Sequence, residues 1–184
     1  MHFSSIVWPF VPLTFAFPLE PRGAPEFVIT DLGATFPYPI PPYGLPSVNS
    51  FIDISVTYPD PTSSTGNNLN TTCSAVWPEG TDPAPIDWTA CASSSLQFRL
   101  PADGWTSTTN FTVELWETLA SSGSGLDASQ LLTSDIGNPS DPNAYLFCIE
   151  KGKFNPLTCT LTGPQGQMQR TVLLPVVELS SRPA

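Results

Sequence analysis

Residues 87–95 (DWTACASSS) place one cysteine between a tryptophan and three consecutive serines. A reactive thiol or a serine nucleophile would need a neighbouring base to take its proton. The only histidine of the chain is His2, and it lies in a segment that we expect to be removed. Ser-His-Asp chemistry, a Cys-His pair and a histidine-based metal site are then excluded. We interpret Ser93, Ser94 and Ser95 as small residues of a tight turn beside a disulfide.

Two catalytic chemistries without histidine remain to be weighed. A serine-lysine dyad could use Lys151 or Lys153, which we expect on an exposed turn. A glycosidase needs two carboxyl groups at a defined separation, and Glu114 and Glu117 stand out in FTVELWETL. Residues three apart on a strand point to opposite faces, and nothing in the sequence brings Asp53 to either of them. We therefore predict no enzymatic activity, no cofactor and no metal site.

Four cysteines can pair in three ways. Short loops close most easily, so we predict the two local disulfides Cys73–Cys91 and Cys148–Cys159. Each would stabilise the fold by about 3 kcal/mol, mainly by restricting the unfolded chain. Disulfides of this kind are typical of extracellular proteins.

The first residues predict secretion. The apolar run from Phe3 to Phe17 is too short to cross a bilayer and matches the core of a signal peptide over residues 1–17. A hydrophobic tail on an intracellular protein is the alternative. Residues 18–46 form a proline-rich arm, which a second cut near Arg22 would shorten. With a net charge of −10 and only six lysines and arginines, binding to nucleic acid or to an anionic membrane is disfavoured.

Alternating apolar and polar residues dominate the rest of the chain and predict an all-β fold. We expect a single antiparallel β-barrel or sandwich over residues 47–180, with a first strand that begins near residue 27. AYLFCIE (144–150), apolar on both faces, is expected to be a central strand. LDASQLLTS (126–134) is the one helix candidate. The expected strands are 27–36, 48–58, 71–77, 96–100, 110–116, 144–150, 157–161 and 171–179.

Two further kinds of surface site follow from short motifs. Asn70 and Asn110 begin N-glycosylation sequons, each at the start of a predicted strand. The tryptophans either fill the core or form a platform for carbohydrate. Trp88 and Trp105 lie in turn-like stretches, so they are our candidates for surface aromatic contacts.

FIDISVTY, NTTCSAVW, DWTACASSSLQF and the later pair FCIEKGKFNPLTC resemble the Alternaria major-allergen family, the Alt a one type, of secreted fungal proteins. The resemblance covers about residues 27–179 and rests mainly on the two cysteine intervals. It implies a β-barrel with the same two disulfides. It also implies a non-enzymatic allergen-like effector or elicitor.

The partner that the resemblance implies is a host plant defence protein of the thaumatin-like class, together with a small phenolic, flavonoid-like ligand at a dimer interface. No cysteine precedes Cys73, so a disulfide-linked dimer is not expected. The competing hypothesis is an extracellular carbohydrate-binding or cell-wall structural protein, which would use Trp88 or Trp105.

Overall fold

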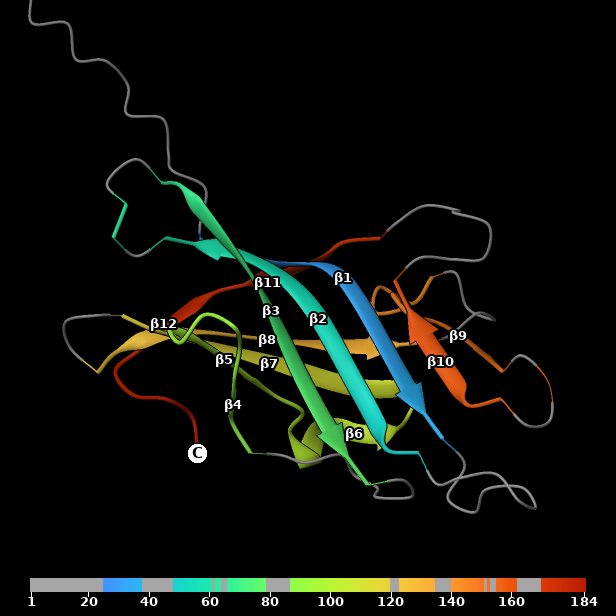
Figure 1. Cartoon of the computed structure of the whole chain (residues 1–184). Coiled ribbons are helices and arrows are strands. Elements are labelled where there is room, and N and C mark those ends of the chain that lie inside the picture. The colour runs from blue at the N-terminus through green and yellow to red at the C-terminus, as the bar shows by residue number, and fades with distance from the viewer. Residues whose placement is uncertain are drawn as a thin grey trace, which may run out of the picture.

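Antiparallel strands and one short 3-10 helix make up the part of the chain that a computed structural model describes (Figure 1). The described ranges are 25–37, 48–60, 62–63, 66–78, 87–119, 123–134, 140–150, 152, 155–161 and 170–184. The predicted signal peptide and most of the proline-rich arm lie outside these ranges.

Sheet A is built around strand β1, which pairs with three other strands. β2 lies along one edge of β1, while the other edge is shared by β11 beside its first half and β10 beside its second half. The strand order is β3-β2-β1-β10-β9, with β11 beside β1. The first strand, expected near residue 27 within the proline-rich range, is therefore a central element of the fold. The strands are β1 (Glu26–Phe36), β2 (Ser50–Pro59), β3 (Asn68–Trp77), β9 (Phe147–Glu150), β10 (Leu157–Thr160) and β11 (Val172–Pro175).

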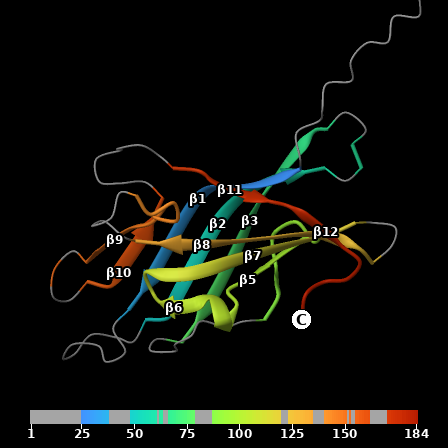
Figure 2. The same cartoon turned by 180° about the vertical axis from the view of Figure 1, so that it is seen from behind.

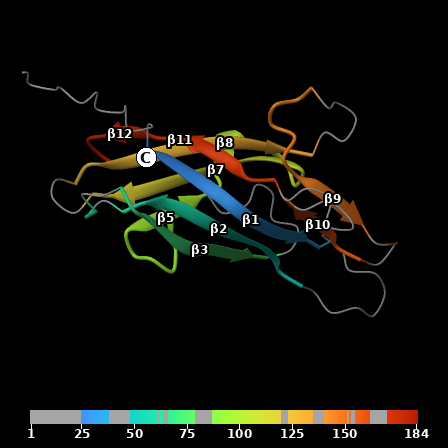
Figure 3. The ribbon, with the colours of Figure 1, turned by 90° about the horizontal axis from the view of Figure 1, so that it is seen from above.

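Sheet B forms the second layer. Its order is β12-β8-β7-β5-β4, with β6 paired to β7 and a 3-10 helix, η1 (Ala102–Gly104), before β6. The strands are β4 (Thr89–Ala90), β5 (Leu96–Arg99), β6 (Trp105–Ser107), β7 (Asn110–Thr118), β8 (Gly125–Thr133) and β12 (Val177–Leu179). The two sheets stack with crossing strands (Figure 3). The all-β prediction and its sandwich form are confirmed; the sheets do not close into the barrel that the resemblance implied.

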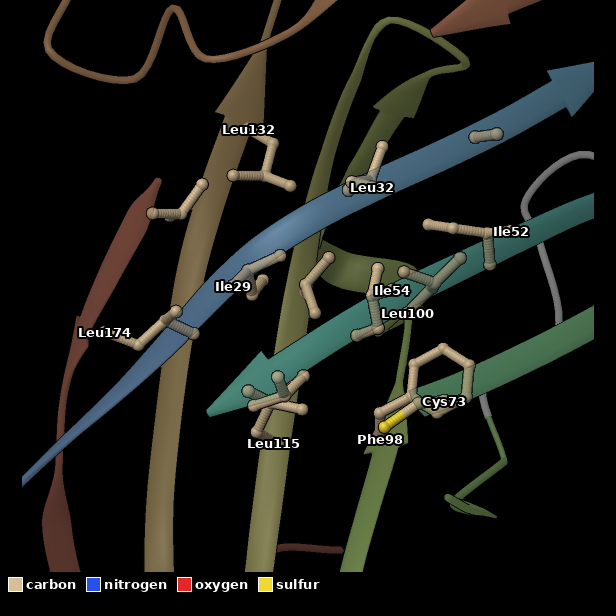
Figure 4. Packing of buried hydrophobic residues seen from close by; sticks show 14 of the residues in the cluster. Ile29, Leu32, Ile52, Ile54, Cys73, Phe98, Leu100, Leu115, Leu132 and Leu174 are labelled. Carbon is tan, nitrogen blue, oxygen red and sulfur yellow. The ribbon is translucent and has the colours of Figure 1, made fainter. Parts of the chain in front are cut away.

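Alternation along the strands puts every second side chain between the layers. Ile52, Ile54, Val56 and Tyr58 of β2 are all buried, as the period of two predicts. In Figure 4, Ile29 and Ile54 from sheet A point toward Leu115 and Leu132 from sheet B. Burying an aliphatic side chain of this size stabilises the fold by roughly 1.5–3 kcal/mol.

Two expected elements are corrected by the structure. The helix candidate, residues 126–134, is almost entirely strand: residues 126–133 belong to β8, which pairs with β7 along its whole length. This pairing overrides a weak helical preference because it satisfies the backbone and buries Ala128 and Leu132. The expected central strand 144–150 is represented by β9, which is at the edge of sheet A and only half-buried. Among the described strands β9 pairs with β10 alone, so one of its edges has no neighbouring strand there.

The last predicted strand, 171–179, is two strands in two different sheets. β11 ends at Pro175 beside β1, and β12 begins at Val177 beside β8. The chain therefore crosses from sheet A to sheet B at Val176. It then continues past β12 to a C-terminus that lies near β4 and β5 (Figures 1 and 2).

Candidate functional site

The Cys73–Cys91 disulfide joins the edges of the two sheets. Cys73 is on β3 of sheet A, Cys91 directly follows β4 of sheet B, and both are buried. Beside the bridge, the Ala92 amide donates to the Thr72 carbonyl oxygen at 2.8 Å. The predicted pairing is confirmed, and it holds the edge of the sandwich closed.

The serines after Cys91 form a hydrogen-bonded turn. The buried Tyr58 hydroxyl donates to Ser93 Oγ at 2.8 Å, and the Ser93 amide donates to Thr71 Oγ1 at 2.9 Å. Ser93 and Ser95 share a hydrogen bond between their hydroxyls at 3.0 Å. A buried tyrosine hydroxyl needs such a partner, so Ser93 has a structural role, as the sequence interpretation predicted.

The Cys148–Cys159 disulfide, also as predicted, lies within sheet A. Its cysteines are directly opposite each other on β9 and β10. Cys159 is buried, whereas Cys148 is half-buried on the edge strand. Lys151 and Lys153, the candidates for a serine-lysine dyad, lie outside the described residues.

The outer face of sheet A carries an open depression of about 570 Å³. It lies where a β-bulge at Thr30 interrupts the β1–β2 register, between that bulge and the turn at Ser93. Most of its side chains are hydroxyl or amide groups. The lining residues are Thr30, Ser55, Val56, Asn70, Thr71, Thr72, Ala92 and Ser93.

The two sequons lie in different environments. Asn70 is exposed at the rim of the depression, and its Oδ1 accepts a hydrogen bond from the Thr57 hydroxyl at 2.5 Å. A glycan on the Asn70 amide nitrogen would leave this bond in place. Asn110 is half-buried at the start of β7, and its Oδ1 is buried without a hydrogen-bond partner among the described residues. Asn70 is therefore the site with room for a glycan.

Trp105 lies in an aromatic cluster at one end of the core. Its ring stacks on Phe111 at 5.4 Å and meets Phe36 and Trp77 edge-on at 6.1 and 6.4 Å. The side chain is half-buried. This placement fits the core-filling alternative rather than a free aromatic platform.

Trp88 is also half-buried, because other groups of the chain lie against it. Its indole N–H donates to the Pro183 carbonyl oxygen at 3.1 Å. The guanidinium of Arg99 lies 4.5 Å from the ring centroid, and that of Arg182 lies 5.7 Å from it. These are cation–π distances, so the Trp88 ring already contacts other side chains of the same chain.

Glu114 and Glu117 point to opposite sides of β7, as predicted. Glu114 faces outward and forms a 2.5 Å ion pair with Arg99, its register partner on β5. Asp127 lies next to this pair on β8, opposite Trp116. Burial, and then the Glu114 charge, raise the pKa of Asp127 to about 6, while Arg99 opposes this shift. The structure thus brings together two carboxylates and a guanidinium that the sequence analysis did not connect.

Glu117 points into the sandwich on the same face of β7 as Val113 and Leu115. It is fully buried, and within the described part of the chain neither carboxylate oxygen has a hydrogen-bond partner. Burial raises its pKa to about 7, and the charge of Asp60 adds to the shift. A carboxyl group so enclosed cannot reach a solvent-borne substrate, so we give it a structural role.

The sequence indicates the inward direction of Glu117 but does not indicate that Asp127 lies beside Glu114. Phe111, Val113, Leu115 and Glu117 share one parity, which alone predicts an inward glutamate. Asp127 was missed because residues 126–134 were expected to be helical, which removes its register with β7.

No helix in the described ranges is long and apolar enough to cross a membrane. Within the same ranges there is no group of three or more histidines, cysteines, aspartates or glutamates placed to hold a metal ion. Comparison with protein-family models, curated proteins and solved structures finds no match to this chain.

Proposed function

We propose that this chain is a secreted, non-enzymatic protein that binds a host plant defence protein and so modulates or elicits immunity. Its two disulfides are typical of extracellular proteins. The thaumatin-like class is the first candidate partner, on the strength of the sequence resemblance. The contact surface in this proposal is the outer face of sheet A, beside the edge strand β3.

The observation that carries the proposal is an exposed apolar pair on that face. Phe51 on β2 and Val76 on β3 are register partners, with 36% and 64% of their surfaces exposed. The solvent face of an antiparallel sheet is usually polar. An exposed apolar group with hydrogen-bonding groups nearby is the composition of a protein interface. The depression at Thr72 and Ser93 supplies such polar groups on the same side of the sheet.

The charge of this face fits a neutral or basic partner. β1, β2 and β3 contain no lysine or arginine, while Asp31 and Asp53 are exposed on them. Charge complementarity of this kind speeds encounter and excludes partners of the same sign. A basic surface on the defence protein would therefore be favoured.

The same geometry argues against the other ligands that the sequence suggested. Small-molecule sites are usually enclosed and mainly apolar, whereas this depression is open and lined by threonine, serine and asparagine. It is a poor site for a small phenolic ligand. Trp88 and Trp105 contact other parts of the chain, so the carbohydrate-binding alternative has less support.

Surface plasmon resonance with a purified plant thaumatin-like protein tests the proposal. We expect saturable binding to the immobilised chain, and Val76→Lys should weaken it at least tenfold. Leu173→Lys is the matched control, because Leu173 is 52% exposed on β11 across the same sheet. This control should bind like the unmodified chain.

Two results would reject the proposal. One is the absence of binding both to thaumatin-like proteins and, by cross-linking through position 76, to any protein of plant extracellular fluid. The other is equal weakening by Val76→Lys and Leu173→Lys. Retention on insoluble glucan or chitin in place of protein binding would favour the carbohydrate-binding alternative.

A further inference from the structure

Residues 180–184 (SSRPA), here named the C-terminal strap, cross the outer face of sheet B. The strap follows Leu179 of β12, which pairs with Gly125 of β8, and it reaches Gln97 and Arg99 on β5. Gly125 is the register partner of Thr118 on β7, while Gln97 and Arg99 are the register partners of Trp116 and Glu114. The strap therefore passes from the β12 side of β7 to the β5 side and ends beside the register partners of Trp116 and Glu114.

Three residues of the strap make polar contacts with this face. The Arg182 guanidinium donates to Gln97 Oε1 and lies over the Trp88 ring. The Pro183 carbonyl oxygen accepts from the Trp88 indole. The Ala184 carbonyl oxygen accepts from Arg99 at 2.5 Å. Each strap residue from 182 to 184 thus contacts a side chain of β5 or the neighbouring Trp88.

The outer face of sheet B beside the strap is unlike an ordinary solvent face. Trp116 and Glu114 point outward from sheet B, yet only 2% and 8% of their surfaces are exposed. Asp127 adds a carboxylate whose Oδ1 is buried and without a partner among the described residues. The ring of Trp88 and the amide oxygen of Gln97 can hold a cationic side chain, while the Arg99 guanidinium, fixed by Glu114, donates to a backbone carbonyl.

We propose that the outer face of sheet B is a binding surface for an extended, arginine-containing segment of a partner protein, and that the strap occupies it as an intramolecular pseudo-ligand. The strap shows the chemistry of the ligand: an arginine against Trp88 and Gln97, then backbone carbonyls to Trp88 and Arg99. Pro183 favours an extended backbone at the residue before it, which suits a segment lying across the strands. The surface goes beyond the proposed function, because it is on the opposite side of the sandwich from Phe51 and Val76.

The contacts of the strap are strong enough to hold it and weak enough to be replaced. The bonds of Arg182 to Gln97 and of Arg99 to Ala184 are solvent-exposed, and exposed charged contacts contribute little each. The tether compensates, because a short linker gives an effective concentration on the order of millimolar. A partner segment can therefore replace the strap only when it makes more contacts with this face than the strap does.

Fluorescence anisotropy with a labelled peptide of the sequence 179–184 (LSSRPA) tests this inference. A chain that ends after Leu179, and so keeps β12, should bind the peptide at least tenfold more tightly than the full chain. The same peptide with alanine in place of its arginine is the matched control and should lose binding. Gln97→Ala in the shortened chain should weaken binding several-fold, with near-ultraviolet circular dichroism confirming the fold.

A folded shortened chain that binds the peptide no better than the full chain overturns the proposal, as does equal binding of the alanine-containing peptide. If the shortened chain does not fold, the full-length Arg182→Ala variant carries the test. It loosens the strap in place and should bind the LSSRPA peptide more tightly than the unmodified chain. No difference between these two full-length chains would also overturn the proposal.

Discussion

The outer faces of the two sheets differ in how far their outward side chains are exposed to solvent, although both sheets pack against the same core. On sheet A, the outward residues of β2 and β3 are mostly threonine, serine and aspartate, and Val76 is 64% exposed. On sheet B, the outward Trp116 is 2% exposed, and the C-terminal strap contacts Trp88 and the outward residues Gln97 and Arg99. The comparison teaches that an outward position on a strand does not guarantee exposure to solvent, and that a distant part of the chain can return to contact an outer face, as the strap does at Trp88.

The difference also separates two modes of binding. Sheet A offers a preformed open surface, so its affinity for a partner should not depend on the C-terminal strap. Sheet B offers a surface that the chain itself occupies, so its affinity should depend on the strap directly.

The largest expected effect comes from removing the bridge between the sheets. Replacing Cys73 and Cys91 by alanine should lower the free energy of unfolding by about 3 kcal/mol, because the unfolded chain regains the entropy of an 18-residue loop. For a chain of this size the melting temperature should fall by roughly 6–12 °C. Calorimetry measures the fall.

The double variant Cys148→Ala/Cys159→Ala is its matched control. This bridge closes an 11-residue loop inside sheet A, so its removal returns a similar entropy to the unfolded chain but leaves the edges of the two sheets joined. Hydrogen exchange should quicken at Thr72 and Ala92 in the first variant and spare them in the second. Equal exchange at these amides in both variants would show that the Cys73–Cys91 bridge does not hold the edge.

Much of the fold could be predicted from the sequence because its main signal is local. The alternation in β2 and β7 and the short cysteine loops need no knowledge of distant segments, and the structure agrees with each. The errors occur where distant partners decide. β8 was expected to be a helix because its pairing with β7 is invisible in its own residues, and β9 was expected to be central because only topology places it at an edge.

The candidate sites were less predictable for the same reason. The inward direction of Glu117 follows from the parity of β7, but its enclosure depends on the opposite sheet. The contact of Trp88 with Pro183 joins residues 95 positions apart, and no spacing rule reaches that far. Exposure of a tryptophan cannot be inferred from a turn-like sequence when the covering segment comes from the other end of the chain.

One glycine on each outer face provides the next test, of intermediate size. A Cβ added at Gly125 on β8 would lie 2.3 Å from Trp116 Cζ2 and 2.3 Å from the Glu117 carbonyl oxygen. Gly125→Ala should therefore cost about 1–3 kcal/mol, the usual penalty for overpacking. Gly33→Ala, on the open face of β1, meets nothing within 4 Å. It should stabilise by about 0.5–1 kcal/mol, because alanine loses less backbone freedom on folding.

Urea unfolding of both glycine variants measures the change in unfolding free energy that each substitution causes. Opposite signs of the change in unfolding free energy would support a covered face on sheet B and an open face on sheet A. A tolerated Gly125→Ala would mean that Trp116 does not pack against β8 as described.

The last effect is gradual, because it is spread over several pH units, and it separates the two glutamates of β7. The pKa of Glu117 is about 7 in the folded protein, against an ordinary value of 4.5, so the folded state holds a proton that the unfolded state releases. Its contribution to stability is complete below about pH 4.5 and declines as the pH rises to about 7. The decline is at most about 1.4 kcal/mol per pH unit. Asp127, with a pKa of about 6, adds a decline of the same sign.

Glu117→Gln removes the proton equilibrium at this site and keeps the side-chain shape. Its unfolding free energy should gain on the unmodified chain as the pH rises from 4.5 to 7, and the two curves should run parallel above that. Glu114→Gln should instead lower stability at pH 7, because it leaves the Arg99 guanidinium without its ion-pair partner. A Glu117→Gln curve parallel to that of the unmodified chain from pH 4.5 to 7 would mean that Glu117 is hydrated. Water would then reach the space between the sheets at Glu117, so the inward face of β7 would not be sealed from solvent there.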